Sequence, residues 1–187
     1  MGLLSMLSIE TGLRAAWDAG YEWGTYLNVE VREHADLWQG VYRKARAPEW
    51  AIERAAATGG GWRLLVLSED WCGDASNTVP VLARFAEAAG VELRILKRDE
   101  HLELMDRYLT NGSRSIPIAI VLDEELRPIA SWGPRPAELQ EFVIREKRAG
   151  QRPVEEIYKD TRRWYARDRG ETTLRELLER IEAAAGD

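Results

Sequence analysis

Cys72 is the residue with the clearest potential for chemistry, because it is the only cysteine among the 187 residues of this chain. It lies in the stretch 68–76, between a short apolar run and a segment with helical spacing. A thiol at the start of a helix faces unpaired backbone N–H groups and the positive end of the helix dipole. Both stabilise the thiolate, which is the nucleophilic form. The position of Cys72 therefore favours a reactive thiol.

Three acidic neighbours act against that reactivity. Glu69, Asp70 and Asp74 surround the cysteine in the sequence, and nearby negative charges raise the pKa of a thiol. A lone cysteine is also often a small buried apolar residue without any reaction to perform. The sequence leaves open whether the helix end or the acids dominate.

Pro117 is the second residue of interest, because it stands at the start of the apolar segment 117–122. Proline has no N–H to donate and is restricted within sheets. This placement predicts a strand entry, a bulge or a cis turn.

The segments that must position these residues alternate between strand and helix patterns. Residues 62–67 form a nearly continuous apolar run, as in a strand buried on both faces, and the following helix ends at Gly90. Asp99 is expected to act as the N-cap of a later helix. The expected order is strand, helix, strand, helix, strand, strand and helix, at about 62–67, 78–89, 91–96, 99–109, 117–122, 128–132 and 139–143. This order predicts an α/β domain with a mixed sheet.

Helical patterns flank this core on both sides. We expect residues 1–58 to be an N-terminal helical extension that packs on the core, with its last helix over 49–57. Gly59 to Gly61 then form a connector, because no Gly-Lys-Ser/Thr follows to make a phosphate loop. The core domain is expected over 59–148. Residues 149–187 form a C-terminal helical extension, with helices over 154–168 and 173–185.

The sequence Trp71-Cys72-Gly73-Asp74, followed 45 residues after the cysteine by Pro117 in Ile116-Pro117, resembles the thioredoxin superfamily. It is most similar to small bacterial thioredoxin-like proteins with a Trp-Cys-Gly-Asp-Cys active site. The sequence 132–136, Trp-Gly-Pro-Arg-Pro, also resembles that group. The resemblance implies a three-layer thioredoxin-like fold with a four-stranded mixed sheet, plus the two helical extensions.

The resemblance also implies roles for residues of the site. Cys72 would be the attacking thiol and Pro117 a cis-proline that faces it. Ile116 would offer its backbone to an extended substrate segment by β-type pairing. The residues implied to contact substrate are Trp71, Gly73, Asp74, Ile116 and Pro117.

Ala75 is the main departure from the family pattern, since it stands where those proteins have their second cysteine. The second thiol normally attacks the mixed disulfide and releases the product. We therefore expect a monothiol thiol-disulfide oxidoreductase, whose mixed disulfides are resolved by an external thiol. The alternatives are a redox-inactive binding module with the same fold and a Cys-to-Ala trapping variant of a dithiol enzyme. A weaker likeness to the Cys-Gly-Phe-Ser site of monothiol glutaredoxins would imply an iron–sulfur cluster.

Composition narrows the partners and the compartment. The net charge of −6 argues against binding to nucleic acids or anionic membranes. A single cysteine cannot form an intramolecular disulfide, and no signal peptide or membrane span is recognisable, so a cytoplasmic location is expected. His34 and His101 have no ligand partners at metal-binding spacing. We expect no metal or cofactor, and a protein disulfide or a low-molecular-weight thiol as substrate.

Overall fold

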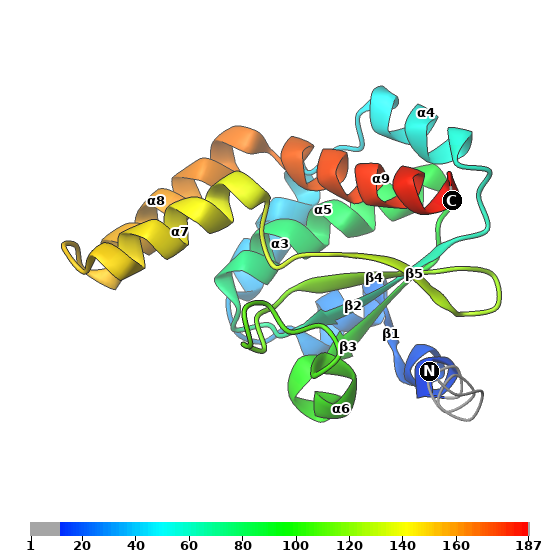
Figure 1. The fold of residues 1–187 in the computed structure, drawn as a ribbon, viewed down its shortest axis with the longest axis horizontal. Helices are drawn as coiled ribbons and strands as arrows, with labels where there is room; N and C mark the ends of the chain where they lie inside the picture. The colour runs from blue at the N-terminus through cyan, green and yellow to red at the C-terminus, as the bar shows by residue number, and fades with distance from the viewer. Residues whose placement is uncertain (1–11, 187) are drawn as a thin grey trace.

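A five-stranded mixed sheet forms the centre of the computed structural model, which describes residues 12–186 (Figure 1). The strand order is β1-β3-β2-β4-β5. Strands β2 and β3 are parallel, and the other neighbours are antiparallel. The strands are β1 (Tyr21–Glu22), β2 (Arg63–Ser68), β3 (Leu93–Lys97), β4 (Ile118–Leu122) and β5 (Pro128–Trp132). The predicted α/β class with a mixed sheet is confirmed.

The predicted number of four strands is wrong. The fifth strand is β1, which comes from the N-terminal segment and pairs antiparallel with β3, with Tyr21 opposite Ile95. A two-residue strand has no period of its own, so its conformation is set by the partner strand. The expectation of a helical N-terminal segment is therefore also wrong at this point, and its residues 1–11 lie outside the described part.

Helices cover both faces of the sheet (Figure 1). Helices α5 (Gly73–Ala89) and α9 (Glu171–Ala185) pack on one face, and α3 (Ala35–Lys44) and α4 (Glu49–Ala57) lie outside them. Residues 12–19, also helical, and α6 (Leu102–Met105) lie on the other side. The other helical segments are short, and they are α2 (Trp23–Thr25), η1 (Tyr26–Glu30) and η2 (Arg98–Glu100).

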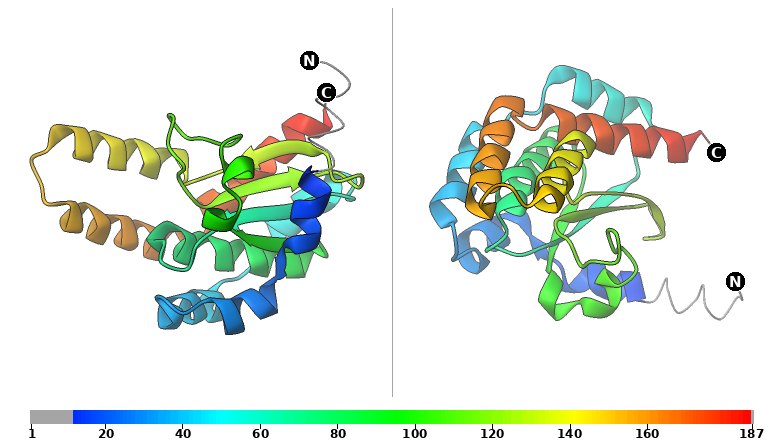
Figure 2. Two further views of the ribbon diagram at one scale, coloured as in Figure 1. Left: turned by 90° about the horizontal axis from the view of Figure 1, so that it is seen from below. Right: turned by 60° about the vertical axis from the view of Figure 1, so that its left-hand side comes forward.

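Helices α7 (Ala137–Ala149) and α8 (Val154–Asp168) form an antiparallel hairpin that projects beyond the sheet (Figure 2). Its own small apolar cluster contains Leu139, Val143, Ile157 and Tyr165. The base of the hairpin lies where α5 begins, so it can contact the residues around Cys72.

The main hydrophobic core joins the sheet to both flanking segments. Strands β2 and β4 are almost wholly apolar and buried, as expected for central strands covered on both faces. Trp38 of α3 is fully buried in the same core, and so are Leu177 and Leu178 of α9.

The helix expected over 99–109 is mostly absent. Only η2 and the four-residue α6 form there, because Arg107 and Tyr108 make tighter turn hydrogen bonds to the carbonyls of Leu104 and Met105. Asp99 does not cap a helix. Its backbone N–H donates instead to Oε1 of Glu69, at 2.8 Å.

Candidate functional site

Cys72 is the N-cap residue of α5 and directly follows the turn that leaves β2. Its backbone carbonyl accepts the first helical hydrogen bond, from the N–H of Ser76 at 3.0 Å. The side chain is only 8% exposed. Its thiol donates to the backbone carbonyl of Ile116, with 3.5 Å between Sγ and the oxygen. The helix N-terminus expected from the sequence is therefore present at this residue.

Burial raises the pKa of the Cys72 thiol above its ordinary value. The negative charge of Asp74 acts in the same direction. The N–H groups of Ala75 and Asp74 lower the pKa, as expected at a helix start, and the guanidinium of Arg135 lowers it too. These favourable contacts do not compensate for the loss of solvent. The resting thiol is therefore mostly protonated at neutral pH.

Ile116 and Pro117 lie opposite the thiol. The peptide bond between them is cis, and both residues are buried. The loop after β5 closes on the same place, since a Cβ on Gly133 would collide with the carbonyl of Pro117. Gly133 has a φ of 129°, a conformation that residues with a side chain rarely adopt. The stretch that begins at Trp132 is thus packed directly against the proline loop.

Asp74 points into the protein and not toward the surface. Its Oδ2 is 2.5 Å from the guanidinium of Arg135, and its Oδ1 accepts a hydrogen bond from the hydroxyl of Tyr165 at 2.9 Å. The side chains of Asp74 and Arg135 are 11% and 14% exposed. We call Asp74, Arg135 and Tyr165 the buried ion cluster. It connects the start of α5 to the loop after β5 and to α8.

The pKa values in this cluster favour a charged arginine and a neutral tyrosine. Burial opposes the charge on Arg135, but the contact with Asp74 outweighs it and raises the pKa of the guanidinium. Burial raises the pKa of Tyr165 well above its ordinary value, and the negative charge of Asp74 adds to this effect. Tyr165 therefore remains a hydrogen-bond donor across the pH range in which proteins are folded.

Sequence reasoning did not identify Arg135 or Tyr165 as site residues. Arg135 lies within the stretch 132–136 that carries part of the family resemblance, so its position between two prolines was the available signal. Tyr165 has no such signal, because it is one of several aromatic residues on an amphipathic helix.

Trp71 and Gly73 are the exposed members of the site. The Trp71 side chain is 42% exposed, and the guanidinium of Arg98 lies 5.4 Å from its ring centroid. Gly73 is exposed, with open space where a side chain would begin. A partner that approaches Cys72 would therefore meet the indole and the glycine first.

The other two acidic neighbours have structural partners. Asp70 accepts the backbone N–H groups of Arg32 and Glu33 through Oδ2, both at 2.8 Å. The indole N–H of Trp38 donates to the carbonyl of Asp70 at 3.0 Å. Glu69 is 7% exposed, and burial raises the pKa of its carboxyl group. These acids hold the loop in place through contacts with the N-terminal segment and η2.

Ala75, at the position of the family's second cysteine, is completely buried in the first turn of α5. Among residues 12–186, no group of three His, Cys, Asp or Glu side chains is placed to hold a metal ion. In the same part of the chain, no helix combines the length and the apolar character needed to cross a membrane.

The parallel β2–β3 pair, the antiparallel β4–β5 pair and a cysteine that begins α5 opposite a cis-proline define a protein of the thioredoxin-fold class. The thioredoxin family model matches residues 20–149, and the chain belongs to this family. Two solved structures share the fold. A Pseudomonas aeruginosa protein of unknown function has 21% identity and a TM-score of 0.69, over 90% of this chain and 96% of its own.

The second structure is an HIV epitope-scaffold, with 19% identity and a TM-score of 0.70. This likeness covers 91% of this chain and 97% of the scaffold. No curated protein matches this chain. At these identities, the two structures establish the fold and leave the reaction to be argued from the site itself.

Proposed function

We propose that this protein is a monothiol exchange protein that forms mixed disulfides through Cys72. The Cys72 thiolate attacks one sulfur of a partner disulfide, the S–S bond breaks, and the other sulfur leaves as a thiolate. A disulfide between Cys72 and the partner remains. An external thiolate then attacks the partner's sulfur in this disulfide. Cys72 leaves as a thiolate, and the partner is now joined to the external thiol in a new mixed disulfide.

The observation that carries this proposal is the contact between Cys72 Sγ and the Ile116 carbonyl at the start of α5. The thiol thus lies next to a backbone segment, and pairing of such a segment with an extended peptide would bring a partner to the sulfur. The exposed indole of Trp71 offers an apolar surface beside it. A partner that pairs with the segment at Ile116 would displace its contact with the thiol and open the way to the sulfur.

The absence of a second cysteine affects how long the mixed disulfide persists. Because Ala75 cannot attack the mixed disulfide, the adduct persists until a free thiol reaches it. A reducing cytoplasm would supply such a thiol as a low-molecular-weight compound. The raised pKa of Cys72 makes the first attack slow, since little thiolate is present at neutral pH. Slow capture and external release are the expected kinetics.

A redox-inactive binding module is the second candidate, and the burial of the thiol favours it. A cysteine that is 8% exposed and has a raised pKa resembles a structural residue. Under this alternative, the surface around Trp71 binds a partner without covalent chemistry.

The deciding experiment uses the native protein and a Cys72→Ser control. Incubation with glutathione disulfide, followed by intact-mass measurement under native conditions, should show one glutathione adduct on the wild type and none on the control. Added reduced glutathione should then reverse the adduct. If the folded wild type stays unmodified while the denatured chain reacts, the exchange function is rejected and the binding module remains.

The pH dependence of iodoacetamide alkylation measures the thiol directly. Because burial raises the pKa, the rate should increase through a midpoint above the ordinary value of about 8.5. An Ala75→Cys variant tests the scaffold in parallel, since gain of disulfide reductase activity would mean that only the resolving thiol is absent. A midpoint below about 8.5 would contradict the dominance of burial over the helix end.

A further inference from the structure

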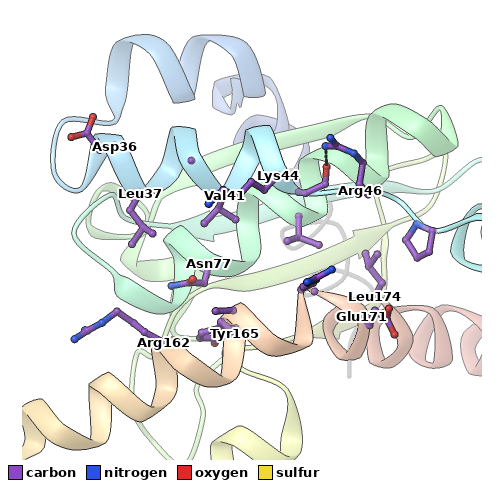
Figure 3. Close-up of a pocket in the computed structure, with 17 residues that line it drawn as sticks. Asp36, Leu37, Val41, Lys44, Arg46, Asn77, Arg162, Tyr165, Glu171 and Leu174 are labelled. Atoms are coloured by element: carbon purple, nitrogen blue, oxygen red, sulfur yellow. Dashed lines mark hydrogen bonds between the residues drawn. The ribbon is translucent and has the colours of Figure 1, made fainter.

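A groove of about 920 Å³ lies between α3 and the segment formed by α8 and the start of α9, with α5 at its base (Figure 3). Tyr165 of the buried ion cluster is one of its lining residues, whereas Cys72, Trp71, Ile116 and Pro117 are not. Its volume is within the range of small-molecule sites, about 300–1,000 Å³. It is therefore a separate feature of the molecule, and the thiol chemistry does not explain it.

The base of the groove is apolar. Leu37 and Val41 line it from α3, Val81 from α5 and Leu174 from α9. Val81 and Leu174 belong to the main hydrophobic core. An apolar ligand group placed here would extend that core, and this burial would favour binding by the hydrophobic effect.

A glycine widens the groove on the α3 side. Residues 36, 37, 40, 41 and 44 recur at helical spacing and all line the groove, so they form one face of α3. A Cβ on Gly40 would meet no atom within 4 Å. The helix surface is thus open in the middle of this face, and a side chain at position 40 would occupy space that a ligand could use.

Positive charge is concentrated around this apolar base. Four cationic side chains line the groove against two acidic ones, an excess of two positive charges in a chain with a net charge of −6. The four cations are Lys44, Arg46, Arg162 and Arg169, and the two acids are Asp36 and Glu171.

The four cations differ in their contacts. Arg46 donates to the carbonyls of Arg43 and Ala45. Within the described residues, the side chains of Lys44, Arg162 and Arg169 form no hydrogen bond or ion pair. Figure 3 shows Lys44 and Arg162 on opposite sides of the groove. Unpaired cations on both sides of an apolar base favour a ligand with one anionic end.

The acids have a local role that does not need a ligand. Asp36 lies in the first turn of α3, and Glu171 in the first turn of α9. Negative side chains there are stabilised by the helix dipole. Arg162 lies in the middle of α8, where the dipole gives no such stabilisation. Lys44 lies in the last turn of α3 and Arg169 is the C-cap residue of α8, so helix dipoles also stabilise these two cations. Arg162 is therefore the cation in the lining that still requires an explanation.

We propose that this groove is a binding site for a small amphipathic anion, with a carboxylate or similar group on the cationic rim and an apolar tail over Val41, Val81 and Leu174. The volume favours a small molecule, and the rim complements its charge. This site does not depend on the redox function of Cys72, so each proposal can fail without the other.

The test is calorimetric titration of the full chain with decanoate, below its micelle concentration, and with decyltrimethylammonium as the cation of equal tail length. Decanoate should bind with a stoichiometry of one, and the cation at least about ten-fold more weakly. Equal affinities, or no decanoate binding at all, would reject the proposal. A Cys72→Ser variant should bind decanoate like the wild type.

Two variants locate the site. Gly40→Leu should fill the groove and weaken decanoate binding by about ten-fold or more, because the tail loses its place. Gly24→Leu is the matched control, since Gly24 is also helical with open space at its Cβ, but is exposed and lies outside the groove. Thermal unfolding first establishes that both variants fold. Unchanged affinity in Gly40→Leu would place the binding elsewhere and reject the groove.

Charge reversal tests the rim. Arg162→Glu should weaken decanoate binding and reduce its dependence on salt, whereas Arg148→Glu, outside the groove, should change neither. A second copy of the chain is the competing occupant. If the wild type self-associates and Gly40→Leu abolishes this without any decanoate binding, the groove is an interface between copies and the proposal is wrong.

Discussion

The two ends of the α7–α8 hairpin are both held by an arginine, but in opposite environments. At the base, Arg135 pairs with Asp74 in the buried ion cluster. At the tip, Arg152 contacts Glu146, Glu156 and Asp160, at distances from 2.6 to 3.6 Å. The side chain of Arg152 is 34% exposed, compared with 14% for Arg135. The tip has more ion pairs, and the base is less exposed to solvent.

This difference shows that the number of ion pairs at a site does not indicate how much stability is lost when one of them is broken. Charges in contact with water are screened, and exposed pairs contribute little to stability. A buried pair gains little over an apolar pair, but breaking it leaves a charge without water or a partner. The base of the hairpin should therefore be sensitive to mutation, and the tip tolerant.

The largest expected effect is at Arg135. Arg135→Met leaves the carboxylate of Asp74 buried without its cation, which should lower the free energy of unfolding by about 3–5 kcal/mol. Urea unfolding followed by tryptophan fluorescence measures it. Arg135→Lys keeps the charge and should lose less. A Met variant as stable as the wild type would mean that water reaches this cluster.

A smaller effect is expected at Tyr165. Tyr165→Phe removes one hydrogen bond to a charged group and keeps the ring in place, for a loss of about 2 kcal/mol. The same urea titration applies. Tyr158→Phe is the control, because Tyr158 is exposed and, within residues 12–186, its hydroxyl hydrogen-bonds only to Lys147, so its loss should not change the unfolding midpoint. Equal effects in the two variants would remove the distinction between base and surface.

The buried ion cluster should also act on the thiol. The charge of Arg135 lowers the pKa of Cys72 and that of Asp74 raises it. Arg135→Met removes the favourable charge and leaves the unfavourable one, so the midpoint of Cys72 alkylation should move to higher pH. The iodoacetamide rate measured against pH shows the shift. An unchanged or lower midpoint would mean that the cluster and the thiol are electrostatically independent.

The smallest effect is expected at the tip. Arg152→Met removes the half-buried ion pairs with Asp160, Glu146 and Glu156. Because Arg152 remains in contact with water, the urea midpoint should change far less than in Arg135→Met, and the alkylation profile should match that of the wild type. Raising the salt concentration should likewise have no visible effect on this variant. A loss of stability comparable to that of Arg135→Met would contradict the comparison.

Much of the fold could be predicted from the sequence because strong local patterns specify it. The segments 128–132 and 154–168 have the predicted bounds as β5 and α8, since a bounded apolar run and a long amphipathic pattern are reliable signals. The strand β1 could not be predicted, because two residues have no period. The helix expected over 99–109 is cut short because Arg107 and Tyr108 form tighter turn hydrogen bonds, which the apolar pattern does not reveal. The donation from the Asp99 backbone N–H to Glu69 is a contact between distant segments, and it could not be predicted either.

For the candidate site, only its position along the sequence could be predicted. The two segments that carry the family resemblance lie side by side, since Cys72 contacts the carbonyl of Ile116. The pairing of Asp74 with Arg135 depends on a loop and a helix brought together by the fold, and spacing alone gives no sign of it. The burial of Cys72 could not be predicted for the same reason, because it depends on how closely the surrounding loops pack.

The anchoring of Asp70 has a consequence for binding. The three groups that donate to it come from 32 to 38 residues earlier in the chain, so the entropic cost of closing this loop is met once, during folding. The neighbouring Trp71 is therefore presented on a preorganised backbone. A partner that binds there does not need to order the loop itself, and more of its contact energy remains as affinity.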